Sequence, residues 1–291
     1  MNTENVAMLL PQPFRGSLMN SYGRGAAPEE VRLRAGRMAT VLMAGKEREL
    51  QACRPVTVRD IETVVELATG ASVHTAADSM RRGFVTARGG IRIGICGNGV
   101  VGNGGVECIR KLSSIAIRLP SEQKGCADGF MTELLAGGLK STIIISPPGG
   151  GKTTLLREMV RKLSDDGMRI SLADERGEIA AVRDGVPQMD IGARTDVMTG
   201  VGKAESAMMF LKTMSPQLIA MDEISAPEDI AAMSSAANCG VLILATAHAD
   251  GLNDFSERPL YKRLRREKIF LRAVLIKVCE SRREYTLEEM G

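Results

Sequence analysis

The arrangement of apolar and polar residues changes near residue 124. Before that position, short segments in which the two kinds alternate are separated by turn residues, as in a small domain that mixes strands and helices. The predicted elements are a strand at 30–34, a strand at 39–43, a helix at 58–67 and a strand at 114–119. We therefore expect an N-terminal α+β domain over residues 1–124.

The segment 83–96 predicts a β-hairpin inside this domain. Gly89 and Gly90 can take the positive φ angles of a tight turn. Three isoleucines fall on one face of the second strand: Ile91, Ile93 and Ile95. The polar stretch 120–125 then interrupts regular structure, so it is the predicted linker between two domains.

Beyond the linker, uninterrupted apolar strands alternate with helical stretches, which is typical of a mostly parallel sheet covered on both faces. The predicted elements are strands at 141–146, 169–173, 218–221 and 240–245, with a helix at 153–163. Residues 125–291 are therefore expected to form an α/β domain. Ligands bind at the carboxyl ends of the strands in such sheets, so the polar residues that follow each strand are the candidate site.

The first of these strands leads into a glycine-rich loop, Ser146-Pro-Pro-Gly-Gly-Gly-Lys-Thr-Thr154, and then into the helix. This order fits the phosphate-binding pattern GxxxxGK followed by Ser or Thr, in which glycines let backbone N–H groups point inward and the helix N-terminus adds positive potential. Ser146 departs from the first glycine of that pattern. We expect the loop to bind ATP with Mg²⁺ through these residues: Pro148, Gly149, Gly150, Gly151, Lys152, Thr153 and Thr154.

Within the loop, Lys152 is expected to reach the β and γ phosphates, and Thr153 is expected to give its hydroxyl to Mg²⁺. A second motif follows the strand at 218–221, where Asp222 would hold the metal ion and Glu223 would act as the general base toward the attacking water. The alternative is that Asp222 and Glu223 only cap the helix that follows.

Further polar positions carry candidate catalytic side chains. Glu175 and Arg176 follow one predicted strand, where a carboxylate can orient water and an arginine can neutralise γ-phosphate charge; a solvated charged turn is the alternative. Arg194 is a candidate arginine finger for a neighbouring subunit, or else a partner of Asp196. His248 follows the last predicted strand and is either a sensor of the γ-phosphate or a structural histidine.

Composition agrees with a folded protein, since 44% of the 291 residues are apolar and 25% are charged. The net charge of +3 permits binding to nucleic acid or to an anionic membrane without demanding it.

The longest apolar runs last about one strand, and the N-terminus has no signal-peptide pattern, so a cytoplasmic protein is expected. The cysteines are spread singly, with only His74 and His248 as further soft ligands, and buried free thiols are expected at these positions: Cys53, Cys96, Cys108, Cys126, Cys239 and Cys279.

The order of the phosphate loop, the Asp-Glu-Arg-x-Glu-Ile segment, the Asp222-Glu223 strand and the Thr-Ala-His248 strand resembles the ordered motifs of the type II and type IV secretion ATPases. Segments along residues 29–272 resemble one family among them, that of stage III sporulation protein AA. These segments are Glu30-Val-Arg-Leu-Arg34, Gly89-Gly-Ile-Arg-Ile-Gly-Ile-Cys96, Ile115-Ala-Ile-Arg-Leu-Pro120, Lys124-Gly-Cys-Ala-Asp128, Gly192-Ala-Arg-Thr-Asp-Val197 and Lys212-Thr-Met-Ser-Pro-Gln217.

The resemblance implies a RecA-like P-loop ATPase domain behind a smaller N-terminal domain. It also implies a homo-oligomeric ring, a hexamer, that is peripheral to the inner membrane in the mother cell and meets a membrane protein of a secretion-like channel into the forespore. It places the nucleotide loop at 149–154, an acidic motif at 174–178, the Asp-Glu pair at 222–223 and a histidine at His248. It further suggests that Arg92 or Arg118 reaches the nucleotide when the domains close; a solvated strand face is the alternative.

Several competing functions share these motifs. A RecA-like nucleic-acid motor would use the arginines at 263–266, but the chain has no Trp, three Tyr and six Phe with which to stack bases, so no nucleic-acid partner is expected. A GTP switch would need a guanine-reading segment such as Asn-Lys-x-Asp, and the chain offers only Gly251-Leu-Asn-Asp254. A small-molecule kinase and a ring scaffold that binds ATP without turnover would also contain a phosphate loop. ATP hydrolysis is the function that we predict.

Overall fold

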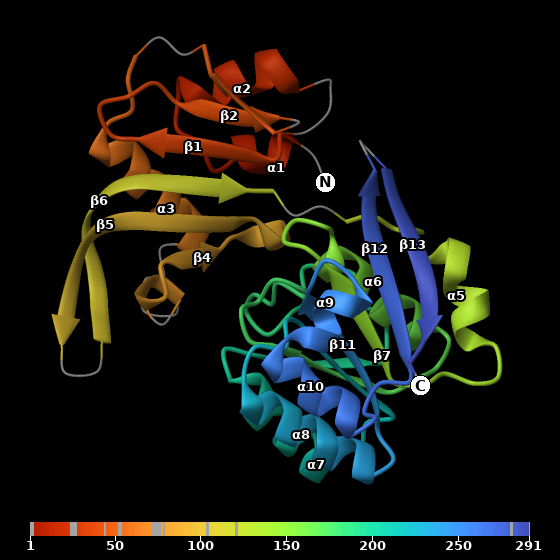
Figure 1. The fold of residues 1–291 in the computed structure, drawn as a ribbon. Helices are drawn as coiled ribbons and strands as arrows, with labels where there is room; N and C mark the ends of the chain where they lie inside the picture. The colour runs from red at the N-terminus through yellow and green to blue at the C-terminus, as the bar shows by residue number, and fades with distance from the viewer. Residues whose placement is uncertain are drawn as a thin grey trace. The chain divides into compact units, whose positions relative to one another are not determined.

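The structure of the chain is a computed structural model that describes residues 3–23, 28–43, 45–51, 54–70, 77, 79–102, 105–119, 122–279 and 282–290. Cys53 and His74 lie outside the described residues. The other cysteines are free, but the expectation that they are buried is wrong, because Cys96 lies in an exposed part of a strand, Cys239 follows the end of a helix and is exposed, and the remaining three are half-buried. The chain divides into two compact units (Figure 1). The first unit contains residues 1–122 and 182–188, and the second contains residues 123–181 and 189–291. The predicted division into an N-terminal domain at 1–124 and an ATPase domain at 125–291 stays a prediction.

The first unit is built on a six-stranded antiparallel sheet in the order β3-β2-β1-β6-β5-β4. Its strands are β1 (Glu30–Arg34), β2 (Thr40–Met43), β3 (Lys46–Glu49), β4 (Phe84–Thr86), β5 (Arg92–Gly102) and β6 (Gly105–Arg118). Its helices are α1 (Thr3–Ala7), α2 (Phe14–Tyr22), α3 (Val58–Thr69) and the 3₁₀ turn η1 (Arg88–Gly90). The strands predicted at 30–34 and 39–43 are confirmed.

The predicted hairpin is also confirmed, because β4 pairs with β5 and both glycines of the turn have positive φ angles, 74° at Gly89 and 72° at Gly90. The isoleucines on the predicted face are all buried: Ile91, Ile93 and Ile95. The paired strands β5 and β6 extend further than expected, over most of 97–113. That outer part is largely exposed, so burial imposes no alternation there that a sequence pattern could reveal.

The helix α3 begins where the sequence predicts because Thr57 and Asp60 form a capping box. The Thr57 hydroxyl accepts the Asp60 N–H at 3.2 Å, and the Asp60 carboxylate accepts the Thr57 N–H at 2.7 Å. Arg54 adds two hydrogen bonds to the same carboxylate, at 2.6 and 2.8 Å. The helix ends at Gly70, whose φ of 61° is left-handed.

The second unit is built on a seven-stranded sheet in the order β13-β12-β7-β11-β10-β8-β9, in which only the edge strand β13 runs antiparallel to its neighbour. Its strands are β7 (Thr142–Ser146), β8 (Ile170–Asp174), β9 (Thr195–Thr199), β10 (Leu218–Met221), β11 (Leu242–His248), β12 (Arg272–Cys279) and β13 (Arg282–Glu289). Its helices are α5 (Asp128–Leu135), α6 (Lys152–Asp165), α7 (Lys203–Thr213), α8 (Pro227–Asn238), α9 (Leu252–Glu257) and α10 (Pro259–Arg266).

The mostly parallel sheet predicted for the second unit is confirmed. Every residue of β7, β8 and β10 is buried, since α6 packs on one face of the sheet while α7 and α8 pack on the other. The strands β9 and β13 were not predicted, because they carry charged or half-exposed residues. The strand β12 was missed although it contains a largely buried apolar run at 273–276. In the part of the chain that the structure describes, no helix combines the length and the hydropathy needed to cross a bilayer.

Candidate functional site

The glycine-rich loop joins the end of β7 to the start of α6, as the sequence predicts. Gly149 and Gly151 have φ angles of 77° and 99°, a left-handed region that side chains with a Cβ rarely adopt. A Cβ at Gly150 would lie 2.1 Å from the Ser146 Oγ. The serine that departs from the usual glycine therefore fits the loop only because position 150 carries no side chain.

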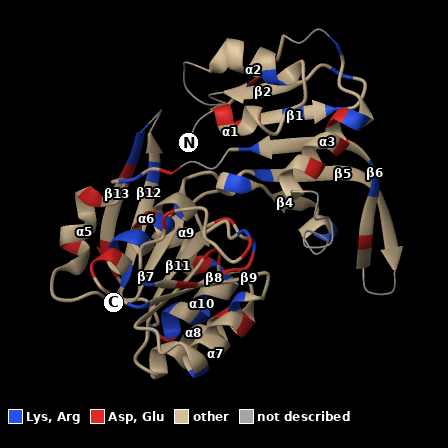
Figure 2. Ribbon diagram, turned by 180° about the vertical axis from the view of Figure 1, so that it is seen from behind, with Lys and Arg blue, Asp and Glu red and all other residues tan. Residues whose placement is uncertain are grey.

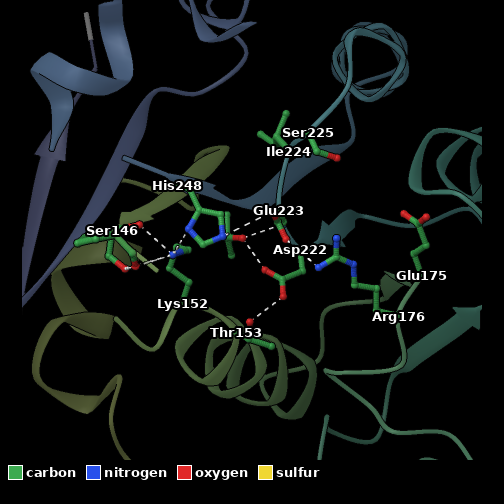
Figure 3. Close-up of polar contacts among 12 residues, drawn as sticks. Ser146, Lys152, Thr153, Glu175, Arg176, Asp222, Glu223, Ile224, Ser225 and His248 are labelled. Atoms are coloured by element: carbon green, nitrogen blue, oxygen red, sulfur yellow. Dashed lines mark hydrogen bonds and ion pairs between the residues drawn. The ribbon is translucent and has the colours of Figure 1, made fainter. Parts of the chain in front are cut away.

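Lys152 is the first residue of α6, and its ammonium group lies over the loop (Figure 3). Its Nζ donates hydrogen bonds to the carbonyl oxygens of Ser146 at 2.8 Å and Pro147 at 2.9 Å, and it contacts His248 Nδ1 at 2.9 Å. The side chain is buried, and this burial lowers the pKa of Lys152. The loop thus holds one lysine ammonium at the carboxyl edge of the sheet.

The loop and β10 meet through a hydrogen bond. The Thr153 hydroxyl donates to Asp222 Oδ2 at 2.7 Å (Figure 3). A hydroxyl and a carboxylate are oxygen ligands of the kind that Mg²⁺ uses together with water and phosphate oxygens. Among the described residues, no group of three or more His, Cys, Asp or Glu is arranged to hold a metal ion by itself. Thr153 and Asp222 could therefore supply part of a Mg²⁺ shell that a phosphate would complete.

Glu223 follows Asp222 with a left-handed backbone, at a φ of 50°. Its carboxylate lies 3.2 Å from Arg176 Nη1 and 3.5 Å from His248 Nε2. The two ring nitrogens of His248 thus face Lys152 and Glu223, respectively. Burial, followed by the charge of Lys152, lowers the pKa of His248, so the ring is neutral at pH 7 and Nδ1 can accept from the ammonium.

Asp174, at the end of β8, is buried and organises the acidic segment. Its carboxylate accepts the backbone N–H groups of Glu178, Ile179 and Ala180 at 2.9 to 3.2 Å. Burial nevertheless raises its pKa. Asp174 therefore folds the segment, which carries Glu175 toward the site.

A pocket opens beside Glu223 at this point. It is lined by Ala173, Asp174, Glu175, Arg176, Glu178, Lys203, Asp222 and Glu223. Lys203 enters from the first turn of α7, and its Nζ donates to the Glu223 carbonyl at 2.8 Å and lies 3.6 Å from Glu175 Oε2. The structure thus brings Glu175 and Arg176 together with Asp222 and Glu223.

A second pocket lies next to the first residues of the loop. It is lined by Ile145, Ser146, Pro147, Asp250, Gly251, Leu275, Ile276, Lys277, Val278 and Thr286. Apolar walls with a few polar groups are typical of sites for small organic ligands.

Three residues that contact this site were missed at the level of sequence. Thr246 left a weak signal, as a hydroxyl inside an apolar strand near His248. No sequence signal indicated Lys203 or Arg283, because each lies on an element that carries no nucleotide-binding motif. Arg283 Nε donates to the Gly150 carbonyl at 3.0 Å.

Arg194 lies away from the site within this chain. It precedes β9, where its carbonyl accepts the N–H of Ile170 at the amino end of β8, so it sits at the edge of the sheet opposite the loop. Its Nη1 donates to the Gly167 carbonyl at 2.7 Å. The alternative ion pair with Asp196 is not formed between these two described residues. The role of Arg194 toward a neighbouring subunit stays a prediction.

The arginines suggested in the first unit have partners within it. Arg118 Nε donates to Glu30 Oε2 at 2.8 Å. The Arg92 guanidinium lies 4.1 Å from the centre of the Phe84 ring. Both arginines are thus engaged on their own sheet.

Solved structures share this fold. The Legionella pneumophila ATPase DotB aligns with a TM-score of 0.58 at 18% sequence identity, over 90% of this chain and 76% of that chain. The pilus retraction motor PilT, solved with bound ADP, aligns with a TM-score of 0.62 at 16% identity, over 91% of this chain and 80% of that one. At these identities the likeness shows that this chain shares the mixed α/β fold of those two proteins.

Comparison with proteins of similar sequence identifies the family of this chain. The family described as "Sporulation stage III, protein AA" matches residues 2–284. The stage III sporulation protein AA of Bacillus subtilis strain 168 is 34% identical over 272 residues, which span 91% of this chain and 88% of that protein. The resemblance found in the sequence segments is thereby confirmed, and the chain belongs to the stage III sporulation protein AA family.

Proposed function

We propose that the chain is a Mg²⁺-dependent ATP hydrolase of the secretion ATPase type. The observation that carries the proposal is the 2.7 Å hydrogen bond between Thr153 and Asp222, because it unites the phosphate loop with the acidic end of β10. Glu223 stands next to this pair, with its carboxylate facing His248 and Arg176. If Asp222 and Glu223 only capped the following helix, that role would not require a hydrogen bond between Asp222 and Thr153 of the loop.

Each side chain of the site then has a defined task. The backbone of residues 148–154 and the ammonium of Lys152 hold the phosphates. Thr153 and Asp222 hold Mg²⁺, which when bound adds positive charge at the phosphate oxygens. Glu223 takes the proton from the attacking water.

The surrounding residues position that base and balance charge. His248 links Lys152 to Glu223 and reports the state of the γ-phosphate to β11. Glu175 orients water from the neighbouring pocket, and Arg176 neutralises charge that develops on the γ-phosphate. The pocket beside Pro147 offers an apolar wall for the nucleoside, which favours a nucleotide over free phosphate.

The proposed setting is a homo-oligomeric ring, a hexamer, on the cytoplasmic side of the inner membrane in the mother cell. The ring would contact a membrane protein of a secretion-like channel and use ATP turnover to drive its assembly or transport through it. Membership of the sporulation family and the fold shared with DotB and PilT support this setting. Arg194 is exposed and is available to a neighbouring subunit.

The test is Mg²⁺-dependent ATP hydrolysis by the purified chain across a range of protein concentrations. Lys152→Ala and Glu223→Gln are expected to abolish turnover, and Glu223→Gln is expected to retain nucleotide binding. Lys212→Ala and Glu228→Gln are matched controls, because both side chains are exposed and outside the site. If Glu223→Gln hydrolysed ATP as fast as the parent, the assignment of Glu223 as the base would be contradicted.

The same assay separates the competing functions. Turnover that rises with protein concentration and ignores single-stranded DNA is the result expected for a self-assembling secretion ATPase. Stimulation by DNA would favour the RecA-like nucleic-acid motor. Tight ATP binding without any turnover in the parent would favour a ring scaffold.

A further inference from the structure

An arginine from the far end of the chain lies against the phosphate loop. Arg283 is the second residue of β13, and its Nε donates a 3.0 Å hydrogen bond to the Gly150 carbonyl, 133 residues earlier in the sequence. A Cβ at Gly151 would lie 2.8 Å from the same nitrogen. The guanidinium is thus packed on the last two glycines of the loop.

This cation has no anionic partner among the described residues. Several arginines of the second unit lie within 4.0 Å of a carboxylate: Arg161, Arg176, Arg258, Arg263 and Arg272. Arg283 instead lies beside the N-terminus of α6, where the helix dipole and Lys152 already supply positive potential. Arg283 is exposed to solvent, and an anion bound at the loop would be attracted by all three positive contributions.

The order of strands fixes the side from which Arg283 approaches. β13 and β12 flank β7 on one side, whereas β10, which carries Asp222 and Glu223, lies on the other side beyond β11. Figure 2 shows basic residues at the beginning of β13. Arg283 therefore faces the loop from the side opposite the carboxylates that would act at the γ-phosphate.

We propose that Arg283 is a nucleotide-binding residue, contributed by the hairpin β12–β13 of the same subunit, which contacts the diphosphate part of the nucleotide while holding the Gly150 carbonyl. The proposal rests on the proposed nucleotide function of the loop. A guanidinium suits this task because its remaining N–H groups lie in a fixed plane and can pair with phosphate oxygens.

The experiment is a calorimetric titration of the purified full chain with Mg²⁺ and ADP. Arg283→Ala removes both the charge and the bond to Gly150. Arg283→Gln removes the charge but places an N–H at the position of the arginine Nε, so it can keep the bond to the loop. Arg282→Ala is the matched control, because Arg282 is exposed on the same strand and makes no described contact with the loop.

Both Arg283 variants are expected to raise the Kd for ADP about 10-fold and to weaken its dependence on salt, while Arg282→Ala stays close to the parent. A Gln variant that binds ADP like the parent would overturn the proposal, since the bond to Gly150 would then be the whole role of Arg283. Unchanged binding in Arg283→Ala would overturn it as well.

Measuring ADP binding and ATP hydrolysis separately distinguishes a failure of this proposal from a failure of the proposed ATPase function. A parent that binds ADP but does not hydrolyse ATP would refute the proposed enzyme and leave the role of Arg283 standing if the variants weaken binding. A parent that binds no ADP would refute both. Thermal unfolding without nucleotide shows whether Arg283→Ala is folded, and the Gln variant decides the question if it is not.

Discussion

The hydroxyl of Thr246 donates a hydrogen bond to Asp222 Oδ1, from a fully buried position on the neighbouring strand. The same hydroxyl accepts the backbone N–H of Glu223 at 2.7 Å. The parallel register, in which Met221 lies opposite Ala245, brings Thr246 beside the two carboxylates. One side chain thus fixes the Asp222 carboxylate, which also accepts from Thr153, and the left-handed backbone at Glu223.

Thr246→Val keeps the shape of the side chain and removes this hydroxyl. We expect kcat for ATP hydrolysis to fall about 10- to 100-fold, because the metal-binding carboxylate and the base both lose their positioning partner. The Kd for ADP should change little. Thr246→Ser restores the hydroxyl and should recover most of the activity, whereas equal loss in both variants would point to packing as the cause.

Lys203 holds the Glu223 segment from the other direction, with its Nζ 2.8 Å from the Glu223 carbonyl and 3.1 Å from the Ser225 hydroxyl. Lys203→Met should lower kcat about 10-fold, since the left-handed turn loses its anchoring donor. Steady-state hydrolysis measures the effect. Lys212→Met, on the exposed face of the same helix, should behave like the parent.

His248 makes the stability of the second unit depend on pH. Its folded pKa lies below the ordinary value of 6.5, so as the pH falls through that value the unfolded chain takes up a proton before the folded chain does. Lowering the pH from about 7.5 to about 5.5 should therefore destabilise the parent more than His248→Gln. Urea unfolding at the two pH values measures this difference, and parallel losses in both proteins would refute it.

Asp60 gives the first unit an acid-sensitive contact. The Arg54 guanidinium lowers the pKa of Asp60 from 3.8 to about 2, so its contribution to stability is complete above 3.8 and is lost as the pH falls toward 2. Asp60→Asn should cost about 1–3 kcal/mol at neutral pH, with a smaller difference from the parent in acid. Urea unfolding followed by circular dichroism tests this, with Glu62→Gln on the same helix as the control.

Arg194 can be tested as an arginine finger by mixing inactive subunits. Lys152→Ala and Arg194→Ala should each be inactive alone, because one lacks a phosphate ligand and the other lacks the charge offered to its neighbour. A mixture should regain ATP hydrolysis, since some interfaces then combine an intact Lys152 with an intact Arg194. An Arg194→Ala protein with parental activity would refute the role.

The sequence by itself determined the features whose physical causes are local. The loop at 146–154 is readable because glycines at fixed spacing must take left-handed angles, and a strand and a helix must flank it. The strand β10 is readable because both of its faces are covered and all its residues are buried. The start of α3 follows from the short-range pairing of Thr57 and Asp60.

Only the tertiary structure decided which distant residues meet at the site. Thr246, Lys203 and Arg283 contact Asp222, Glu223 and Gly150 through the order and register of the strands and the packing of α7, and no local spacing encodes these contacts. The edge strand β13 escaped prediction because its charged sequence lacks the apolar run of a central strand. The inner strand β12 was missed although it contains an apolar run at 273–276, because no motif or glycine-rich turn marked its position. Long-range pairing depends on the free energy of the whole sheet, so the assembled fold, rather than any single segment, places these side chains on the loop.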